Sequence, residues 1–154
     1  MKQSNITIPL DEKDHTILDE LKKNGRLSSQ QLSKKTKLPI STIHNRIKKM
    51  ESSGAIRGYT VVIDEKKTGM IMAYLLVTVD YHPPDGTIID QYELAKKIKH
   101  IPCVAEVSMT TGASDIIVKV QSRNMDELNE FVTKQLRSFK GVDKTQTLVV
   151  LNSI

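Results

Sequence analysis

Residues 22–50 read KKNGRLSSQQLSKKTKLPISTIHNRIKKM and contain nine Lys or Arg residues but no Asp or Glu. The nine cations are Lys22, Lys23, Arg26, Lys34, Lys35, Lys37, Arg46, Lys48 and Lys49. A surface of one sign suits a phosphate backbone, because each cation that reaches a phosphate releases condensed counterions. The plain alternative is a solvated charge run. The same stretch also carries the signals of two helices joined by a tight turn, and this coincidence of charge and motif favours DNA binding.

Two helix starts are visible in the first third of the chain. Asp11 is placed to cap a first helix. Ser28 and Gln31 form the capping box Ser-x-x-Gln, and the leucines on either side fit a hydrophobic staple. The second helix should therefore begin after Ser28 and run to about Thr36.

A third helix is predicted from about Ile40 to Ser52. Ile43, Ile47 and Met50 fall on one face at helical spacing. The opposite face carries Ser41, Asn45, Lys48 and Lys49, flanked by Thr42 and His44, with Arg46 at the edge of the apolar stripe. Helix, short turn and helix with cations outward is the helix-turn-helix pattern, whose second helix enters the major groove.

Double-stranded DNA is the partner that this pattern indicates. The candidate DNA-contacting residues are Ser28, Ser29, Gln30, Lys34, Ser41, Thr42, His44, Asn45, Arg46, Lys48 and Lys49. Each set has an alternative interpretation. The outer helix face can be merely solvated, Arg46 can be a packing or ion-pair residue, and residues 28–30 can serve only to cap a helix.

Charge divides the chain into two parts. Residues 1–60 carry a net charge of +6 and residues 61–154 a net charge of −1. We expect a helix-turn-helix domain over residues 1–54, a strand and linker over 55–69 with the strand at 56–63, and a second domain over 70–154. The chain has one cysteine, no signal peptide and no long apolar run, so the expectation is a cytoplasmic protein.

The back half predicts a βαββαβ order. Its expected elements are strands at 71–81, 104–110, 114–121 and 142–151, and helices at 90–100 and 125–139. This α+β order is that of a ferredoxin-like sandwich, in which both helices cover one face of a four-stranded sheet. We expect Leu75, Val77 and Val79 on the other face, which predicts a homodimer that buries sheet against sheet.

The ordered motifs resemble those of the Lrp/AsnC, or feast/famine, family of transcription regulators. They are Leu10-Asp11-x-x-Asp14-x-x-Ile17-Leu18, Gly25-Arg26-Leu27-Ser28, Leu32-Ser33, Ile43-x-x-Arg46-Ile47-Lys48-x-Met50-Glu51-x-x-Gly54-x-Ile56, Thr111-Gly112-x-x-Asp115 and Gly141-Val142. The resemblance implies an N-terminal helix-turn-helix domain and a C-terminal ferredoxin-like module that dimerises and binds small effectors, most often amino acids. It also implies that dimers can assemble into octamers.

The candidate effector-binding residues are Thr111, Gly112, Ala113, Ser114 and Asp115, since the resemblance places this loop near the effector pocket. Backbone N–H groups suit an amino acid's carboxylate, and Asp115 suits its ammonium. The alternative is an ordinary hairpin turn in which Asp115 accepts local backbone hydrogen bonds. This sequence departs from the family pattern at three places. Relatives usually have Gly at the position of Lys37 and a Ser cap at the position of Pro39-Ile40. They often have an aromatic residue at the position of Ser114.

Two other functions are compatible with parts of the sequence. Tetrapyrrole (sirohaem) decarboxylases share the architecture, and His82, His100 and Arg123 would be their only loose counterparts here. A stand-alone amino-acid-binding module would need no cationic outer helix. No nucleophile motif, phosphate loop or histidine spacing of a metal site is present in the sequence, so the chain is expected to be no enzyme and to need no cofactor or metal.

Overall fold

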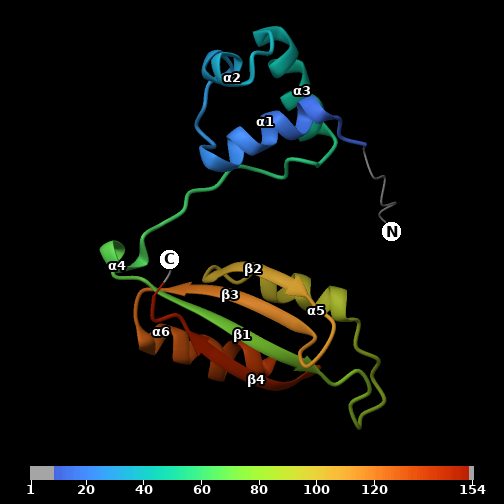
Figure 1. Ribbon diagram of the computed structural model, residues 1–154. Helices are drawn as coiled ribbons and strands as arrows, with labels where there is room; N and C mark the ends of the chain where they lie inside the picture. The colour runs from blue at the N-terminus through green and yellow to red at the C-terminus, as the bar shows by residue number, and fades with distance from the viewer. Residues whose placement is uncertain (1–8, 153–154) are drawn as a thin grey trace. The chain divides into compact units, whose positions relative to one another are not determined.

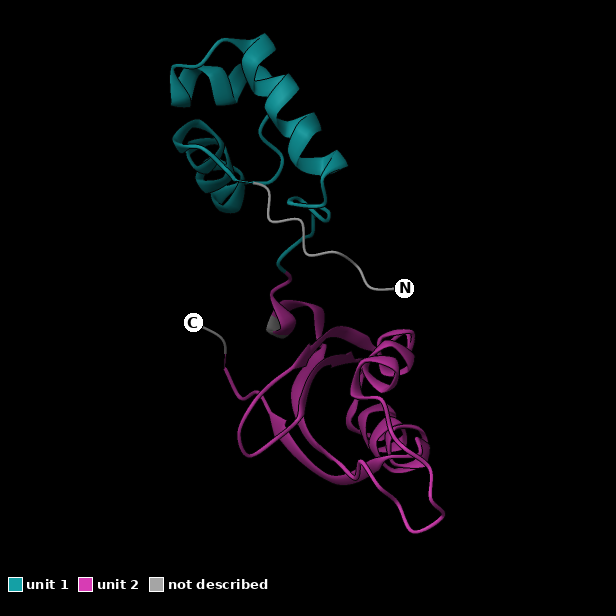
Figure 2. Ribbon diagram, turned by 90° about the vertical axis from the view of Figure 1, so that its right-hand side faces the viewer, with its two compact units in different colours: residues 1–62 teal, residues 63–154 magenta. Residues whose placement is uncertain are grey.

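The computed structural model describes residues 9–152, which divide into two compact units, residues 9–62 and residues 63–152 (Figure 2). The N-terminal unit holds α1 (Glu12–Lys23), α2 (Ser29–Thr36) and α3 (Ile40–Ser52). The C-terminal unit holds a sheet with helices on one face. Within the described part of the chain, no helix is long and apolar enough to cross a bilayer.

The predicted helix caps of the N-terminal unit are confirmed. Asp11 caps α1 and forms a capping box with Asp14, and Ser28 forms the expected box with Gln31 at the start of α2. The three helices pack around a small core of fully or almost fully buried side chains: Ile17, Leu32, Ile43 and Met50. These caps and this core fix the outward direction of the α3 face.

The turn between α2 and α3 accommodates a side chain at the position where the family resemblance implied glycine. Lys37 has φ 60°, and among the described residues it is the only non-glycine with positive φ. Ser33 supports the turn, since its hydroxyl donates to the Leu38 carbonyl at 2.6 Å. Pro39 begins α3 without a side-chain cap, as the sequence indicated.

The strand predicted at residues 56–63 is wrong. The segment is irregular, and it leads into a short helix, α4 (Glu65–Thr68), where the sequence indicated a polar break. Val61 and Val62 are 74% and 100% exposed. A strand needs a neighbour to accept its backbone hydrogen bonds, and β-branched residues alone do not supply one.

The C-terminal unit has the predicted βαββαβ order. Its elements are β1 (Ile71–Val79), α5 (Gln91–Lys99), β2 (Val104–Met109), β3 (Ile116–Ser122), α6 (Met125–Glu130) and β4 (Val142–Val149). The sheet order is β2-β3-β1-β4 and every pairing is antiparallel (Figure 1). This is the ferredoxin-like arrangement that the sequence predicted.

The last helix differs in its second half from the continuous helix predicted over 125–139. After α6 the chain forms a π-helical segment (Phe131–Gln135) and a 3-10 turn (Leu136–Ser138). The wider turn spaces Phe131 and Leu136 five residues apart on the buried side, and Gln135 is exposed. Hydrophobic spacing predicted the helix but not this local widening.

The prediction of which β1 residues lie on the open face of the sheet is also wrong. Leu75, Val77 and Val79 are buried against the helices inside the core of the unit. The alternate residues of β1, such as Tyr74 and Leu76, lie on the other face and are half-buried. Because β1 is apolar on both sides, a period of two cannot tell which side the helices cover.

Candidate functional site

The outer face of α3 presents polar and cationic side chains to solvent. Ser41, His44, Asn45, Lys48 and Lys49 are exposed, and Thr42 is half-buried. They lie opposite the buried Ile43 and Met50 on the same helix, so packing of the unit holds the exposed face in one direction. Such a face can offer an amide and ammonium groups to base edges and phosphates.

The basic stretch is only partly free to meet a polyanion. Lys23 and Lys35 both pair with Glu20, at 2.6 and 2.9 Å, and these hydrogen bonds lower the pKa of Glu20. By contrast, four lysines on α2, the turn and α3 have no acidic partner among the described residues: Lys34, Lys37, Lys48 and Lys49. Their charge is therefore open to solvent or to an external partner.

Arg46 forms ion pairs, as the alternative interpretation of this residue predicted. One terminal nitrogen, Nη1, contacts Asp11 Oδ2 at 2.7 Å and Asp14 Oδ1 at 2.8 Å. Asp14 is buried, and the hydrogen bonds to Asp14 and then Asp11 raise the pKa of Arg46. The same guanidinium, after the Asp14 amide, lowers the pKa of Asp11. Arg46 therefore links α3 to the start of α1.

Of the three candidate residues at the start of α2, one caps the helix and, in the described part of the chain, two have free backbone amides. Ser28 uses its hydroxyl to accept from the Gln31 amide, and its own amide donates to the Gln31 side chain at 2.9 Å. Ser28 is thus engaged in capping. The amides of Ser29 and Gln30 have no acceptor among the described residues and lie at the positive end of the helix.

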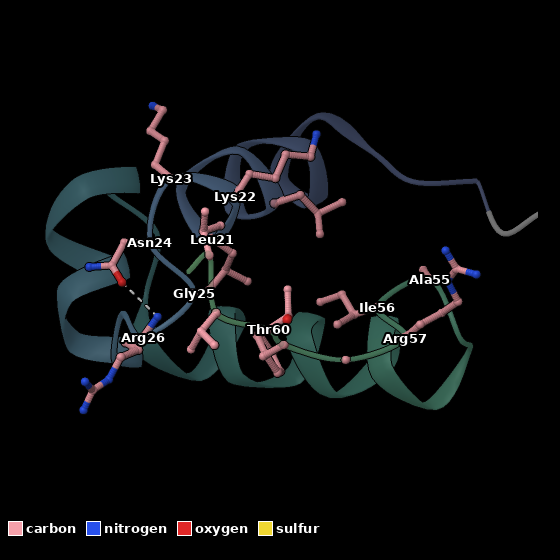
Figure 3. Close-up of a pocket in the computed structure, with 15 residues that line it drawn as sticks. Leu21, Lys22, Lys23, Asn24, Gly25, Arg26, Ala55, Ile56, Arg57 and Thr60 are labelled. Atoms are coloured by element: carbon pink, nitrogen blue, oxygen red, sulfur yellow. Dashed lines mark hydrogen bonds between the residues drawn. The ribbon is translucent and has the colours of Figure 1, made fainter. Parts of the chain in front are cut away.

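A groove of about 1050 Å³ lies elsewhere in the N-terminal unit, between the end of α1 and the chain that leaves α3 (Figure 3). Leu21 and Ile56 contribute apolar lining, and Lys22, Arg26 and Arg57 lie around it. Tyr59 also lines it, and its hydroxyl donates to Glu51 at 3.0 Å. None of the α3 face residues contributes to this groove.

The candidate effector loop joins β2 to β3. Thr111, Gly112 and Ala113 are exposed, and Gly112 has φ 118°, a conformation that favours glycine. The amides of residues 111–114 have no acceptor among the described residues. Ser114 is half-buried, and its carbonyl accepts from the Thr110 hydroxyl at 2.7 Å.

Asp115 is held by two residues that the sequence did not single out. Tyr81 donates its hydroxyl to Asp115 Oδ1 at 2.9 Å, and Gln91 donates its side-chain amide to the Asp115 carbonyl at 2.6 Å. They lie 34 and 24 residues away in the chain. No local pattern in the sequence could have connected them to the loop.

The three candidates for the decarboxylase alternative do not converge within one chain. His82 follows β1, whereas Arg123 follows β3, which runs antiparallel to β1, so the two lie at opposite ends of the sheet. Arg123 pairs with Glu127 at 3.2 Å, and the His100 ring contacts the Lys96 carbonyl. Over the described residues, no cluster of His, Cys, Asp and Glu has the geometry of a metal site.

Two family models match the chain. A winged helix-turn-helix DNA-binding model matches residues 10–57, and the Lrp/AsnC ligand binding domain matches residues 72–154, more than half of the chain. The chain belongs to the Lrp/AsnC family. It is a transcription regulator with an N-terminal DNA-binding domain and a C-terminal ligand-binding domain, as its motifs indicated.

Similar regulators cover almost the whole chain. An HTH-type transcriptional regulator of Pyrococcus furiosus is 39% identical over 91% of both chains. The HTH-type transcriptional regulator FL11 of Pyrococcus horikoshii is 37% identical over 96% of this chain and 93% of its own.

Solved structures of the family have the same fold. Escherichia coli AsnC matches with a TM-score of 0.70, 26% identity and 95% coverage of each chain. A transcriptional regulator of Neisseria meningitidis solved with L-methionine matches with a TM-score of 0.75 and 28% identity, over 95% of this chain and 92% of that one.

Proposed function

We propose that this Lrp/AsnC regulator binds specific sites on double-stranded DNA through the outer face of α3 and responds to an amino acid or a related small metabolite. The observation that carries the DNA half is the division of α3 into a buried stripe and an exposed polar and cationic face. A protein with this role acts in the cytoplasm, where the DNA of a prokaryote lies. It needs no enzymatic activity and no cofactor.

The proposed DNA contacts are made by polar groups that are not already engaged in the fold. Asn45 is exposed on α3 and can read adenine by two hydrogen bonds. The remaining face residues, Ser41, Thr42, His44, Lys48 and Lys49, contact neighbouring bases or phosphates. Lys34 and the free amides of Ser29 and Gln30 hold the phosphate backbone. Arg46 and Ser28 support the fold instead, because their polar groups are already engaged.

A homodimer is proposed on the open face of the sheet. Tyr74, Leu76 and Ile117 are half-buried there, although the helices cover the opposite face. A second copy that packs on this face would bury them and place two α3 helices on one DNA site. Further assembly to an octamer is part of the proposal. Light scattering should show no folded monomer of 17.3 kDa at micromolar concentration.

A pair of variants tests the DNA half. Asn45→Ala should relax base preference at one position by roughly 1–3 kcal/mol, whereas Lys34→Ala should weaken binding to all sequences alike. Affinities for a selected genomic site and for random DNA are measured for both. If both variants act identically on the two DNAs, the assignment of α3 as the reading helix is wrong.

The effector half rests on the free amides of residues 111–114, on the match to the Lrp/AsnC ligand binding domain, and on the neisserial relative solved with L-methionine. Those amides suit a carboxylate. Calorimetry with each of the twenty amino acids tests it. Heat from at least one, with a shift of DNA affinity worth roughly 1–3 kcal/mol, is the expected result. No heat from any of them would leave the loop as a hairpin turn.

A further inference from the structure

Asp115 has each of its backbone polar groups in a hydrogen bond. Its amide donates to the Val77 carbonyl at 2.9 Å, which ties the residue to β1. Its carbonyl accepts from the Thr110 amide at 2.8 Å and from the Gln91 side chain at 2.6 Å. The first bond closes the loop on itself, and the second ties it to the first residue of α5.

The carboxylate of Asp115 is engaged at both oxygens. Oδ2 accepts from the Val79 amide at 2.8 Å, and Oδ1 accepts from the Tyr81 hydroxyl at 2.9 Å. The hydrogen bond to Asp115, followed by burial, raises the pKa of Tyr81. A charged acceptor makes both bonds stronger than bonds between neutral groups. The residue is half-buried, unlike the exposed residues at 111–113.

The segment that Tyr81 begins is held at its other end as well. Lys140 pairs with Asp85 and donates to the Thr87 hydroxyl. A Cβ added to Gly141 would lie 2.6 Å from the Ile89 side chain, which shows how closely this segment packs against the start of β4. Asp115 therefore joins the loop to a segment that is itself fixed, and the loop cannot shift without disturbing it.

We infer that Asp115 is a positioning residue of the effector site and not the ligand of an effector's ammonium group. Its carboxylate holds the loop against Val79 and Tyr81, so that the amides of residues 111–114 face a ligand carboxylate with fixed geometry. The ligand class that this loop recognises is then a small carboxylate. This inference rests on the proposed effector function of the loop.

The first test compares two ligands on one variant, Asp115→Asn, which keeps the size of the side chain and loses one acceptor. The ligands are the amino acid that binds best in the calorimetric panel and its des-amino analogue, in which hydrogen replaces the ammonium. A positioning role predicts that both affinities fall by the same factor, about tenfold. A loss for the amino acid ten times larger than that for the analogue would make Asp115 the ammonium ligand and overturn the inference.

The second test leaves the carboxylate in place and also applies if the analogue does not bind or if Asp115→Asn does not fold. Tyr81→Phe removes one hydrogen bond that orients Asp115. The positioning role predicts that affinity for the amino acid falls severalfold. An ammonium ligand with one oxygen released would bind equally well or more tightly, and that result would overturn the inference. Tyr92→Phe, at an exposed tyrosine on α5, is the matched control.

Failure of the two proposals can be told apart. If the wild-type protein gives no heat with any amino acid, the proposal that this loop binds an effector is wrong, and Asp115 has no ligand to position. If the wild type binds and Tyr81→Phe binds unchanged, the effector loop stands and only the positioning role fails. Affinities are compared at a temperature at which the melting curve of each variant shows it folded, so that loss of stability is not read as loss of affinity.

Discussion

The two units of this chain differ most in the size of their cores and in where their functional groups lie. Among the residues that the structure describes, the N-terminal unit packs around four buried apolar residues, whereas the C-terminal unit packs around fifteen. The proposed DNA-binding face is the outside of one regular helix, α3, and helical spacing sets it. The candidate effector loop instead owes its geometry to hydrogen bonds between distant segments. The first kind of surface needs only one packed helix, whereas the loop needs several distant segments brought together.

The largest expected effect comes from a substitution in the smaller core, that of the N-terminal unit. Ile43→Ala removes one of the four core residues and should cost about 2–5 kcal/mol, which a unit of this size cannot spare. DNA binding should be lost, and calorimetry should show the C-terminal unit still melting cooperatively. The control is Ile98→Ala, at a fully buried position in the larger core. If Ile98→Ala lowered the melting temperature of the N-terminal unit as much as Ile43→Ala does, the two cores would not be independent.

The next effect separates a fold-supporting cation from a DNA-contacting one. Lys48→Ala should reduce the slope of log affinity against log salt concentration by about 0.9, the value for one phosphate contact. Arg46→Ala should leave that slope unchanged and lower the melting temperature of the N-terminal unit, because it leaves the buried Asp14 unpaired. A loss of slope with Arg46→Ala equal to that with Lys48→Ala would show that Arg46 reaches the DNA.

A smaller effect should appear in acid and concerns the segment between β1 and α5. Hydrogen bonds from Lys140 and then Thr87 lower the pKa of Asp85 from 3.8 to about 2. A lowered pKa in the folded state adds stability above pH 4, and this is lost as the pH falls from 4 to 2. Wild type should melt higher than Asp85→Asn at pH 6, and the gap should close by pH 2. A gap that stays constant over this range would contradict the pairing.

The smallest expected effect sharpens the account of the turn before α3. Lys37→Gly relieves the left-handed backbone at φ 60° and should stabilise the N-terminal unit by about 0.5–1 kcal/mol, after the added entropy of the unfolded chain is subtracted. Lys34→Gly is the control, because it places glycine inside α2 and should destabilise by about 1 kcal/mol. Thermal melting of both variants measures the difference, and equal shifts would refute a strained turn.

Much of the N-terminal unit could be predicted because its signals are local. The capping box of Ser28 and Gln31 and the bounds of α3 follow from residues a few positions apart. The exposure of Asn45 and Lys48 follows from the period of the helix. The partner of Arg46 could not be predicted in this way, since Asp11 lies 35 residues away. The sequence is therefore equally compatible with an ion pair and with a DNA contact for Arg46, and packing of α1 against α3 selects the ion pair.

In the C-terminal unit the sequence by itself determined the order of strands and helices, because strand and helix periods and turn residues are properties of short segments. Tertiary structure decided which face of β1 lies under the helices, since both faces are apolar. At the junction of the two units along the chain, tertiary structure also left residues 56–63 without a neighbouring strand. Only tertiary structure brought Asp115 next to Tyr81 and Gln91. A hydrogen bond depends on distance in space, and residues 34 and 24 positions apart in the chain give no local pattern that predicts it.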